Sequence, residues 1–297
     1  MNRQRRAEAL LALATLIWGV SYYLSRVCFA ELEPMTLNAF RFLSAFAVLT
    51  PLYHSHLRGI SRETLRCGVL VGLVLVVIYI GATVGIKYTS LSNAGFISCL
   101  AVVFTPMLEL LFFGKRPGRQ MAAALALCTV GLALLTLSDG LGGFAMGDAL
   151  CLLCSLGYGI DIILTDCFMA RPKVDPIGMC VVEMGITGIV FLLLSAWFEQ
   201  PRLPHAPEVW AAALFLGVFC SGVTFAIQNT QQRYTTAARA ALIFTLEPLF
   251  SAIIAYVFAG ERLRLRAYLG AALMFLSLLL MQADLGVKKH DDIREGV

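Results

Sequence analysis

Ten long apolar stretches, separated by short polar breaks, run through almost the whole chain. They cover residues 7–29, 36–54, 66–88, 92–113, 119–138, 147–168, 175–197, 208–230, 239–259 and 266–283. An α-helix needs about 20 mostly apolar residues to cross the hydrocarbon core of a bilayer. The pattern therefore predicts an all-α polytopic membrane protein with ten transmembrane helices and no separate soluble domain.

Composition supports this prediction. Hydrophobic residues make up 59% of the 297 positions and charged residues only 14%. In a soluble domain, roughly a quarter of all residues are charged. The basic start of the chain, followed by an apolar run, resembles a signal peptide. It lacks, however, a small-x-small cleavage site followed by the polar start of a mature protein. We therefore expect residues 7–29 to be retained as the first span.

The nine cysteines do not suggest a disulfide framework, because eight of them lie in or near apolar runs. Cys151 and Cys154 have the C-x-x-C spacing of redox or metal sites. The pair lies inside an apolar span, however, with no second motif to complete a site, and cysteine in such a helix behaves as a small apolar residue. We expect neither a metal nor a cofactor.

The basic residues in the loops predict the orientation, because cytoplasmic loops are enriched in Lys and Arg. With a cytoplasmic N-terminus, 15 of the 23 Lys and Arg residues lie inside and six outside, while Arg41 and Arg239 lie in or at the edge of spans. Both termini are therefore expected in the cytoplasm, for a multi-pass protein of the plasma membrane, most simply a bacterial inner membrane.

An internal repeat divides the chain into residues 1–140 and 141–297. Tyr88-Thr89 recurs as Tyr234-Thr235, 146 positions later, and the same offset relates Gly114-Lys115-Arg116 to Gly260-Glu261-Arg262. Each half contains five spans, an odd number, so the halves are expected to have opposite orientations. Inverted repeats of this kind are common in secondary transporters, whose substrate site lies near the membrane midplane between the repeats.

These features resemble the EamA-type families of the drug/metabolite transporter superfamily. The resemblance rests on the Trp18-Gly19 pair of the first span, on Arg41-Phe42 in the second, and on residues 235–263, which contain Gly260-Glu261-Arg262 near their end. Lys115 departs from the family pattern, in which Glu is usual. The resemblance implies an inverted-repeat fold with a central cavity lined by helices one to four and six to nine, and with helices five and ten at the periphery. It leaves open amino acids, nucleotide and sugar derivatives, phosphorylated metabolites, organic cations and drugs as substrates.

Ionisable residues inside membrane spans cost roughly 2.5–3.5 kcal/mol each on insertion scales, so each needs a partner, a watery cavity or an interface. Asp161, Glu183 and Glu247 lie seven or eight residues from the predicted cytoplasmic ends of their spans. At ~1.5 Å per residue they share one layer, ~10–12 Å deep. We expect this layer to contribute to the substrate site or to ion coupling.

A polar and aromatic stripe supports a cavity wall at Asp161. Tyr158, Asp161 and Thr165 recur at helical spacing, and their repeat partners Trp18, Ser21 and Ser25 form the same stripe on the first span, beside Tyr22. Further candidates for substrate binding are Tyr79, Thr83, Asn93, Gln228, Asn229 and Phe244. The alternative is that these residues join helices, cap their ends or fill the core.

Three charges are candidates for a coupling or structural role. Arg41 is the repeat partner of Glu183, but the two are expected at different depths, so Arg41 is expected either to extend to the outer interface or to pair with Glu31 or Glu33. Glu247 precedes Pro248, which loosens the helix. We expect Glu247 to pair with Arg239 or Arg233.

The sequence thus predicts a secondary transporter that exports an amino acid, amine or similar metabolite by alternating access. The carboxyl groups are protonatable, which makes proton antiport a further expectation, and the expected partners are a small molecule, the bilayer and protons, without nucleic acid. An enzyme is not expected, because all four histidines lie in loops or the tail. A carrier for another metabolite class and a non-transporting receptor remain alternatives.

Overall fold

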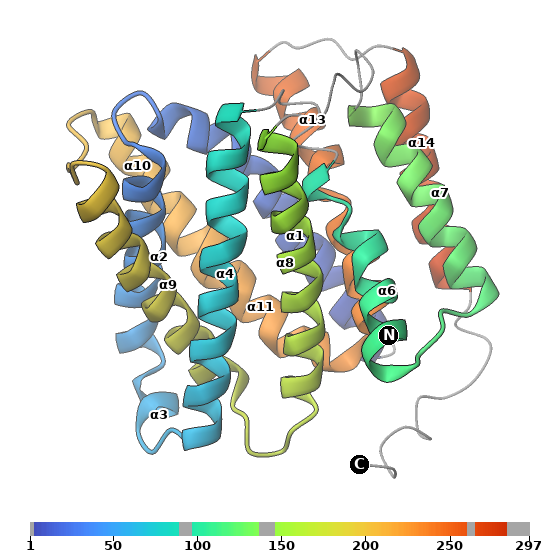
Figure 1. Ribbon diagram of the computed structural model, residues 1–297, viewed down its shortest axis with the longest axis horizontal. Helices are drawn as coiled ribbons and strands as arrows, with labels where there is room; N and C mark the ends of the chain where they lie inside the picture. The colour runs from blue at the N-terminus through green and yellow to red at the C-terminus, as the bar shows by residue number, and fades with distance from the viewer. Residues whose placement is uncertain (1–2, 89–96, 137–145, 260–264, 284–297) are drawn as a thin grey trace.

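A computed structural model describes residues 3–88, 97–136, 146–259 and 265–283. These residues form a bundle of helices without strands (Figure 1). Within them, nine helical segments are long and apolar enough to cross a membrane, and Ala101–Phe113 is a shorter apolar helix. The all-helical membrane architecture predicted from the apolar pattern is therefore confirmed. The predicted span 92–113 lies partly outside the described residues.

The helices follow the predicted spans closely. The first half contains α1 (Arg3–Cys28), α2 (Pro34–Leu52), the short α3 (His54–Leu57), α4 (Arg62–Tyr88), α6 (Ala101–Phe113) and α7 (Arg119–Thr136). The second half contains α8 (Met146–Met169), α9 (Pro176–Phe198), α10 (Pro207–Gly217), η1 (Val218–Val223), α11 (Thr224–Gln231), η2 (Gln232–Tyr234), α12 (Ala237–Phe244), α13 (Glu247–Ala259) and α14 (Leu265–Ala283).

Two spans of the second half are not regular helices. The span formed by α10 and α11 contains η1, a π-helical segment, and such segments occur frequently at functional sites. The predicted span 239–259 is interrupted at Thr245 and Leu246, between α12 and α13. Pro248 has no N–H to bond the carbonyl of Phe244, one turn earlier, so the break agrees with the predicted loosening.

Small residues bring the central helices into close contact. A methyl group at Gly81 of α4 would lie 2.7 Å from the carbonyl oxygen of Leu150 on α8, and one at Gly72 would lie 3.0 Å from that of Glu183 on α9. Glycine at helix crossings allows this approach in membrane proteins, where van der Waals packing replaces the hydrophobic effect. The α4 helix therefore holds α8 and α9, which carry two of the predicted carboxyl groups, in fixed positions.

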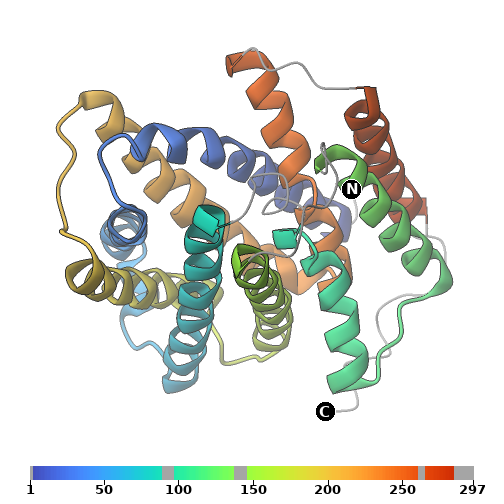
Figure 2. The same cartoon turned by 45° about the horizontal axis from the view of Figure 1, so that its top comes forward.

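The helices α7 and α14 lie side by side at one edge of the bundle (Figures 1 and 2). They cross where Gly131 faces Gly270, and a methyl group at Gly270 would lie 2.5 Å from the carbonyl oxygen of Gly131. This position matches the peripheral place that the resemblance implied for helices five and ten. The candidate site is therefore built by the remaining helices.

Candidate functional site

A small cavity lies where helices of both halves meet. It has a volume of about 50 Å³. The first half lines it with Trp18 of α1, with Ser98 and Cys99 just before α6, and with Ala101 and Val102 of α6. The second half lines it with Tyr158, Asp161 and Ile162 of α8, Gln228 of α11, Ala241 and Phe244 of α12, Thr245, and Glu247 of α13. Six of the predicted residues therefore line one space. The described lining has two carboxyl groups and three aromatic rings, but no Lys or Arg.

The aromatic wall of this cavity is fixed by Trp18. Its Nε1 donates a hydrogen bond to the carbonyl oxygen of Cys220 in η1 at 2.9 Å. Its ring makes edge-on contacts with Phe225 and Phe244, with centroid distances of 5.5 and 5.2 Å. Aromatic rings held in this way offer a rigid surface that can attract a cation.

Asp161 is the carboxyl group at the centre of the site. Its side chain is 2% exposed, and its Oδ2 accepts a hydrogen bond from Nε2 of Gln228 at 3.0 Å. Oδ1 is buried and has no hydrogen-bond partner among the described residues. An ionised carboxylate buried in this way is costly unless a cation or a proton neutralises it.

Glu183 lies behind the cavity rather than on its wall. The residue is fully buried, and its Oε2 accepts a hydrogen bond from Nδ2 of Asn229 at 2.9 Å, whereas Oε1 has no partner in the described part of the chain. Asp161 and Glu183 are close enough to interact electrostatically. We call Asp161, Glu183, Gln228 and Asn229 the carboxyl–amide layer.

The two amides of this layer are consecutive residues of α11. Neighbouring side chains of an α-helix point about 100° apart, so Gln228 reaches α8 and Asn229 reaches α9. One turn later, Gln232 donates to the carbonyl oxygen of Ile162 on α8 at 2.5 Å. The predicted alternative, in which Gln228 and Asn229 cap a helix end, is not what their side chains do.

Arg41 does not extend to an interface, and its described hydrogen bonds go to η1 rather than to Glu31 or Glu33. The residue is 6% exposed. Its Nε donates to Oγ of Ser221 at 2.5 Å and its Nη2 to the carbonyl oxygen of Cys220 at 3.0 Å, both in η1. The guanidinium also lies 5.1 Å from the ring centroid of Tyr79. Arg41 therefore holds the π-helical segment against α2.

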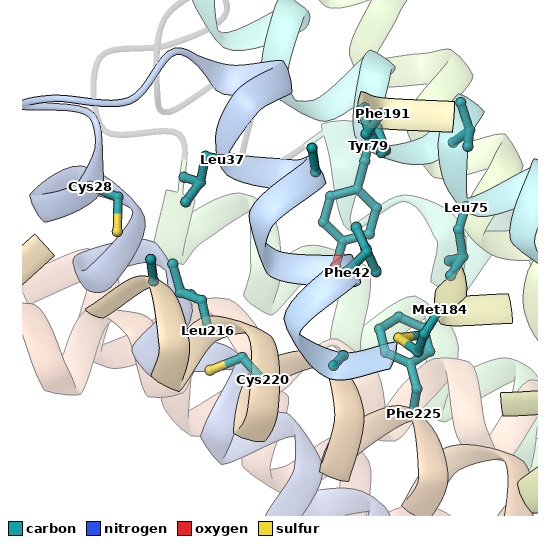
Figure 3. Packing of buried hydrophobic residues seen from close by; sticks show 14 of the residues in the cluster. Cys28, Leu37, Phe42, Leu75, Tyr79, Met184, Phe191, Leu216, Cys220 and Phe225 are labelled. Carbon is teal, nitrogen blue, oxygen red and sulfur yellow. The ribbon is translucent and has the colours of Figure 1, made fainter. Parts of the chain in front are cut away.

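The rings around Arg41 form a packed layer beside the site. Phe42 contacts Tyr79 edge-on at 4.9 Å and stacks on Phe191 at 6.1 Å between ring centroids (Figure 3). Tyr79 is 8% exposed and does not line the central cavity. Its predicted role in substrate binding therefore has no support in this geometry, since it packs in the core.

Arg239 binds a residue that the sequence did not single out. Its Nη1 forms an ion pair with Oε1 of Glu8 on α1 at 3.1 Å, and its Nη2 donates to the carbonyl oxygen of Met281 on α14 at 3.2 Å. The hydroxyl of Thr235 also donates to Glu8, at 3.2 Å. The described side-chain bonds of Arg239 therefore go to Glu8 and Met281 rather than to Glu247, and the alternative pairing of Glu247 with Arg233 stays a prediction.

The remaining predicted residues take varied positions. The hydroxyl of Thr83 donates to the carbonyl oxygen of Tyr79 in its own helix. Ser21 and Thr165 are buried, and the Thr165 hydroxyl has no partner among the described residues. Asn93 and the side chain of Tyr22 lie outside the described residues.

A larger hollow lies at the other end of the bundle and contains none of the predicted site residues. Its volume is about 720 Å³, and it is bounded by the α1–α2 connection and the ends of α4 and α9. Glu199 lies in its wall, and its carboxylate accepts hydrogen bonds from the backbone N–H groups of Met35 and Thr36 at 2.9 and 2.8 Å. These bonds cap the start of α2, which is a structural role.

Known proteins resemble this chain over nearly its whole length. An uncharacterized transporter of Archaeoglobus fulgidus is 27% identical over 279 residues, which are 93% of this chain and 85% of the relative. The uncharacterized transporter YvbV of Bacillus subtilis is 26% identical over 295 residues, 96% of this chain and 94% of the relative. The uncharacterized inner membrane transporter YedA of Escherichia coli strain K12 is 23% identical over 283 residues, 92% of this chain and 89% of the relative.

A crystal structure of another protein, 17% identical, has the same fold, with a TM-score of 0.78 over 94% of this chain and 97% of that chain. The sequence profile of the EamA-like transporter family matches the chain twice, over residues 5–137 and 145–282. The resemblance that rested on short motifs is thereby confirmed. The chain belongs to the EamA-like transporter family and is a multi-pass membrane transporter.

Proposed function

We propose that this transporter is a secondary-active exporter of a small metabolite with an ammonium group, an amine or an amino acid. The observation that carries the proposal is the central cavity, whose described lining holds Asp161 and Glu247 but no Lys or Arg. A positively charged group would compensate the Asp161 carboxylate, whose Oδ1 has no partner among the described residues, and the rings of Trp18 and Phe244 would attract it further. A phosphorylated or nucleotide substrate would lack a cationic partner on this wall.

The proposed mechanism is alternating access of two inverted five-helix repeats, residues 1–140 and 141–297, with both termini in the cytoplasm. Supporting features are the odd number of predicted spans per half, the excess of Lys and Arg in the predicted cytoplasmic loops, and the family profile, which matches each half separately. In this proposal the ten spans include α6, and the cavity lies where the two repeats meet.

The cavity of about 50 Å³ is too small for a whole metabolite, since ligand pockets usually measure ~300–1,000 Å³. It would hold an ammonium group or one to two water molecules, each of which takes ~30 Å³. Side chains or helices must therefore move to admit the substrate, as alternating access requires. Proton antiport would drive the cycle through the protonatable carboxyl groups Asp161 and Glu183.

The proposal is tested first by ligand stabilisation. Purified protein is heated in detergent with choline, putrescine, leucine or adenosine monophosphate, and the unfolding temperature is compared with that of the unliganded protein. We expect stabilisation by at least one of the three amines but not by the nucleotide. Asp161→Asn should remove the stabilisation, whereas Glu208→Gln, an acid-to-amide change at an exposed position of α10, should retain it.

Transport is then measured in proteoliposomes. Saturable uptake of the stabilising amine that is stimulated by counterflow identifies a carrier, and an inward or outward pH gradient tests the coupling. Asp161→Asn and Glu183→Gln should both abolish pH-driven transport. Stabilisation by the nucleotide alone would contradict the amine proposal, binding without counterflow would favour a receptor, and unchanged pH-driven transport in both variants would exclude the proton coupling.

A further inference from the structure

The two buried carboxyl groups of the carboxyl–amide layer differ in one respect that suggests different tasks. Asp161 lines the cavity, whereas Glu183 is not among its described lining residues. Both accept one hydrogen bond from a neutral amide, at 3.0 and 2.9 Å, and both leave their second oxygen without a partner in the described part of the chain. A substrate in the cavity can reach Asp161 but has no described route to Glu183.

We propose that Asp161 binds the ammonium group of the substrate, that Glu183 carries the proton, and that the consecutive amides Gln228 and Asn229 connect the two. This assignment rests on the proposed function and deepens it. In each cycle an O–H bond forms on the Glu183 carboxylate when one side of the membrane has access to it and breaks when the other side has access. The proton is exchanged for one substrate ammonium released from Asp161, so charge is conserved.

The link between the two groups follows from helix geometry. Gln228 and Asn229 share the rigid backbone of α11, so a rotation or shift of this helix that loosens one hydrogen bond also moves the other. The helix begins directly after η1, whose π-helical turn is a place where the register can change. Arg41 holds η1 through Ser221 and the carbonyl oxygen of Cys220. A change at Glu183 is therefore transmitted to Asp161 without direct contact.

The surroundings of Glu183 are consistent with a single proton site. The charged or titratable groups near it, among the described residues, are Asp161 on α8 and Cys180 on the preceding turn of α9. Tyr79 of α4 and Arg41 of α2, the titratable and charged groups that these two helices carry in the packed layer, contact each other. The α11 helix carries no charge, η1 contributes Cys220, and His56 of α3 pairs with Asp175 at 3.0 Å, two turns away.

Infrared difference spectroscopy between acidic and alkaline buffer tests the proton site without any substrate. We expect the protonated-carboxyl C=O absorption of the purified wild-type protein to contain a band that is lost in Glu183→Gln and retained in Asp161→Asn. Glu208→Gln serves as the matched control and should retain the band. An absorption that is unchanged in Glu183→Gln would overturn the assignment, even where Asp161→Asn alters it.

Transport of choline tests whether Asp161 and Glu183 have different tasks. The quaternary ammonium group of choline cannot release a proton, so any pH dependence of its transport must come from the protein. In proteoliposomes, we expect Glu183→Gln to keep choline-for-choline exchange at a rate that no longer varies with pH, and to lose uptake driven by a pH gradient by at least tenfold. Asp161→Asn should lose both. Equal loss of exchange and driven uptake in the two variants would overturn the division of tasks.

Failure of the broader proposal has a different signature. If the wild-type protein transports none of the amines, the amine proposal fails, but the infrared band still decides whether Glu183 binds a proton. If amines are transported and the band does not depend on Glu183, only the present inference fails.

Discussion

Two groups of buried carboxyl side chains in this protein are held in different ways. Near the beginning of α1, Glu8 pairs with the guanidinium of Arg239 at 3.1 Å, and Thr235 adds a hydrogen bond. In the carboxyl–amide layer, Asp161 and Glu183 each accept one hydrogen bond from a neutral amide among the described residues. The first carboxylate is compensated by the protein itself, whereas the other two leave a charge for something else to compensate.

The positions of the two groups explain this difference. Glu8 and Trp18 are ten residues apart on α1, so the ion pair lies ~15 Å along the helix from the cavity wall. There it joins α1, α12 and α14. The carboxyl–amide layer instead adjoins the cavity, where an internal counter-ion would compete with a substrate. The buried ion pair thus joins helices, whereas the carboxyl–amide layer is where the proposed substrate and proton would bind.

The largest expected effect comes from breaking the ion pair. In Arg239→Met, Glu8 keeps its buried position, 3% exposed, but loses its counter-charge, so we expect a loss of about 3–5 kcal/mol in the free energy of unfolding. Thermal unfolding of the purified protein in detergent measures it. The double variant Glu8→Gln/Arg239→Met should recover most of the loss, since no charge is then left unpaired. Equal destabilisation of the single and double variants would show that charge compensation is not the role of Arg239.

A smaller effect is expected when the amide next to Glu183 is removed. Asn229→Leu has a similar volume but takes away the donor at 2.9 Å, and an unsatisfied buried acceptor costs about 1–3 kcal/mol. The same thermal unfolding assay applies. Thr230→Val is the matched control, because the bonds of the Thr230 hydroxyl, in the described part of the chain, go to its own helix turn and to Gln231. If Asn229→Leu is no less stable than the control, the Asn229 bond does not support Glu183.

The sequence predicted the spans well because a membrane helix needs a continuous apolar stretch, which can be recognised from neighbouring residues alone. It also located the break in the span 239–259, since Pro248 removes a specific backbone bond. It did not indicate η1, because a π-helical turn leaves the apolar pattern unchanged. Trp18, Tyr158 and Asp161 were found because polar and aromatic residues recur at helical spacing on one face.

The partners of the two arginines could not be predicted in the same way. Arg239 and Glu8 are 231 residues apart, and Arg41 and Ser221 are 180 apart. Such contacts depend on how the helices assemble, which no local pattern specifies. Glu8 lies in the first turns of α1 next to basic residues, a sequence pattern typical of a solvent-exposed segment, although its side chain is buried. Ser221 and Cys220 had no signal beyond being small residues in a span.

The smallest expected effect on stability is also the most direct test of the difference between Glu8 and the two carboxyl groups of the carboxyl–amide layer. Asp161→Asn and Glu183→Gln keep the size of the side chain and keep an oxygen that accepts from Gln228 or Asn229, so each should change the free energy of unfolding by less than about 1 kcal/mol. Glu8→Gln is the matched control, and it should cost more, because Arg239 then keeps a buried charge without its carboxylate. Thermal unfolding of the three variants side by side gives the order. A carboxyl that can be neutralised at little cost to the fold is free to change its charge during transport, whereas one that cannot is part of the scaffold. Destabilisation by Asp161→Asn or Glu183→Gln as large as that by Glu8→Gln would place all three carboxyl groups in the scaffold and remove the physical basis for a coupling role.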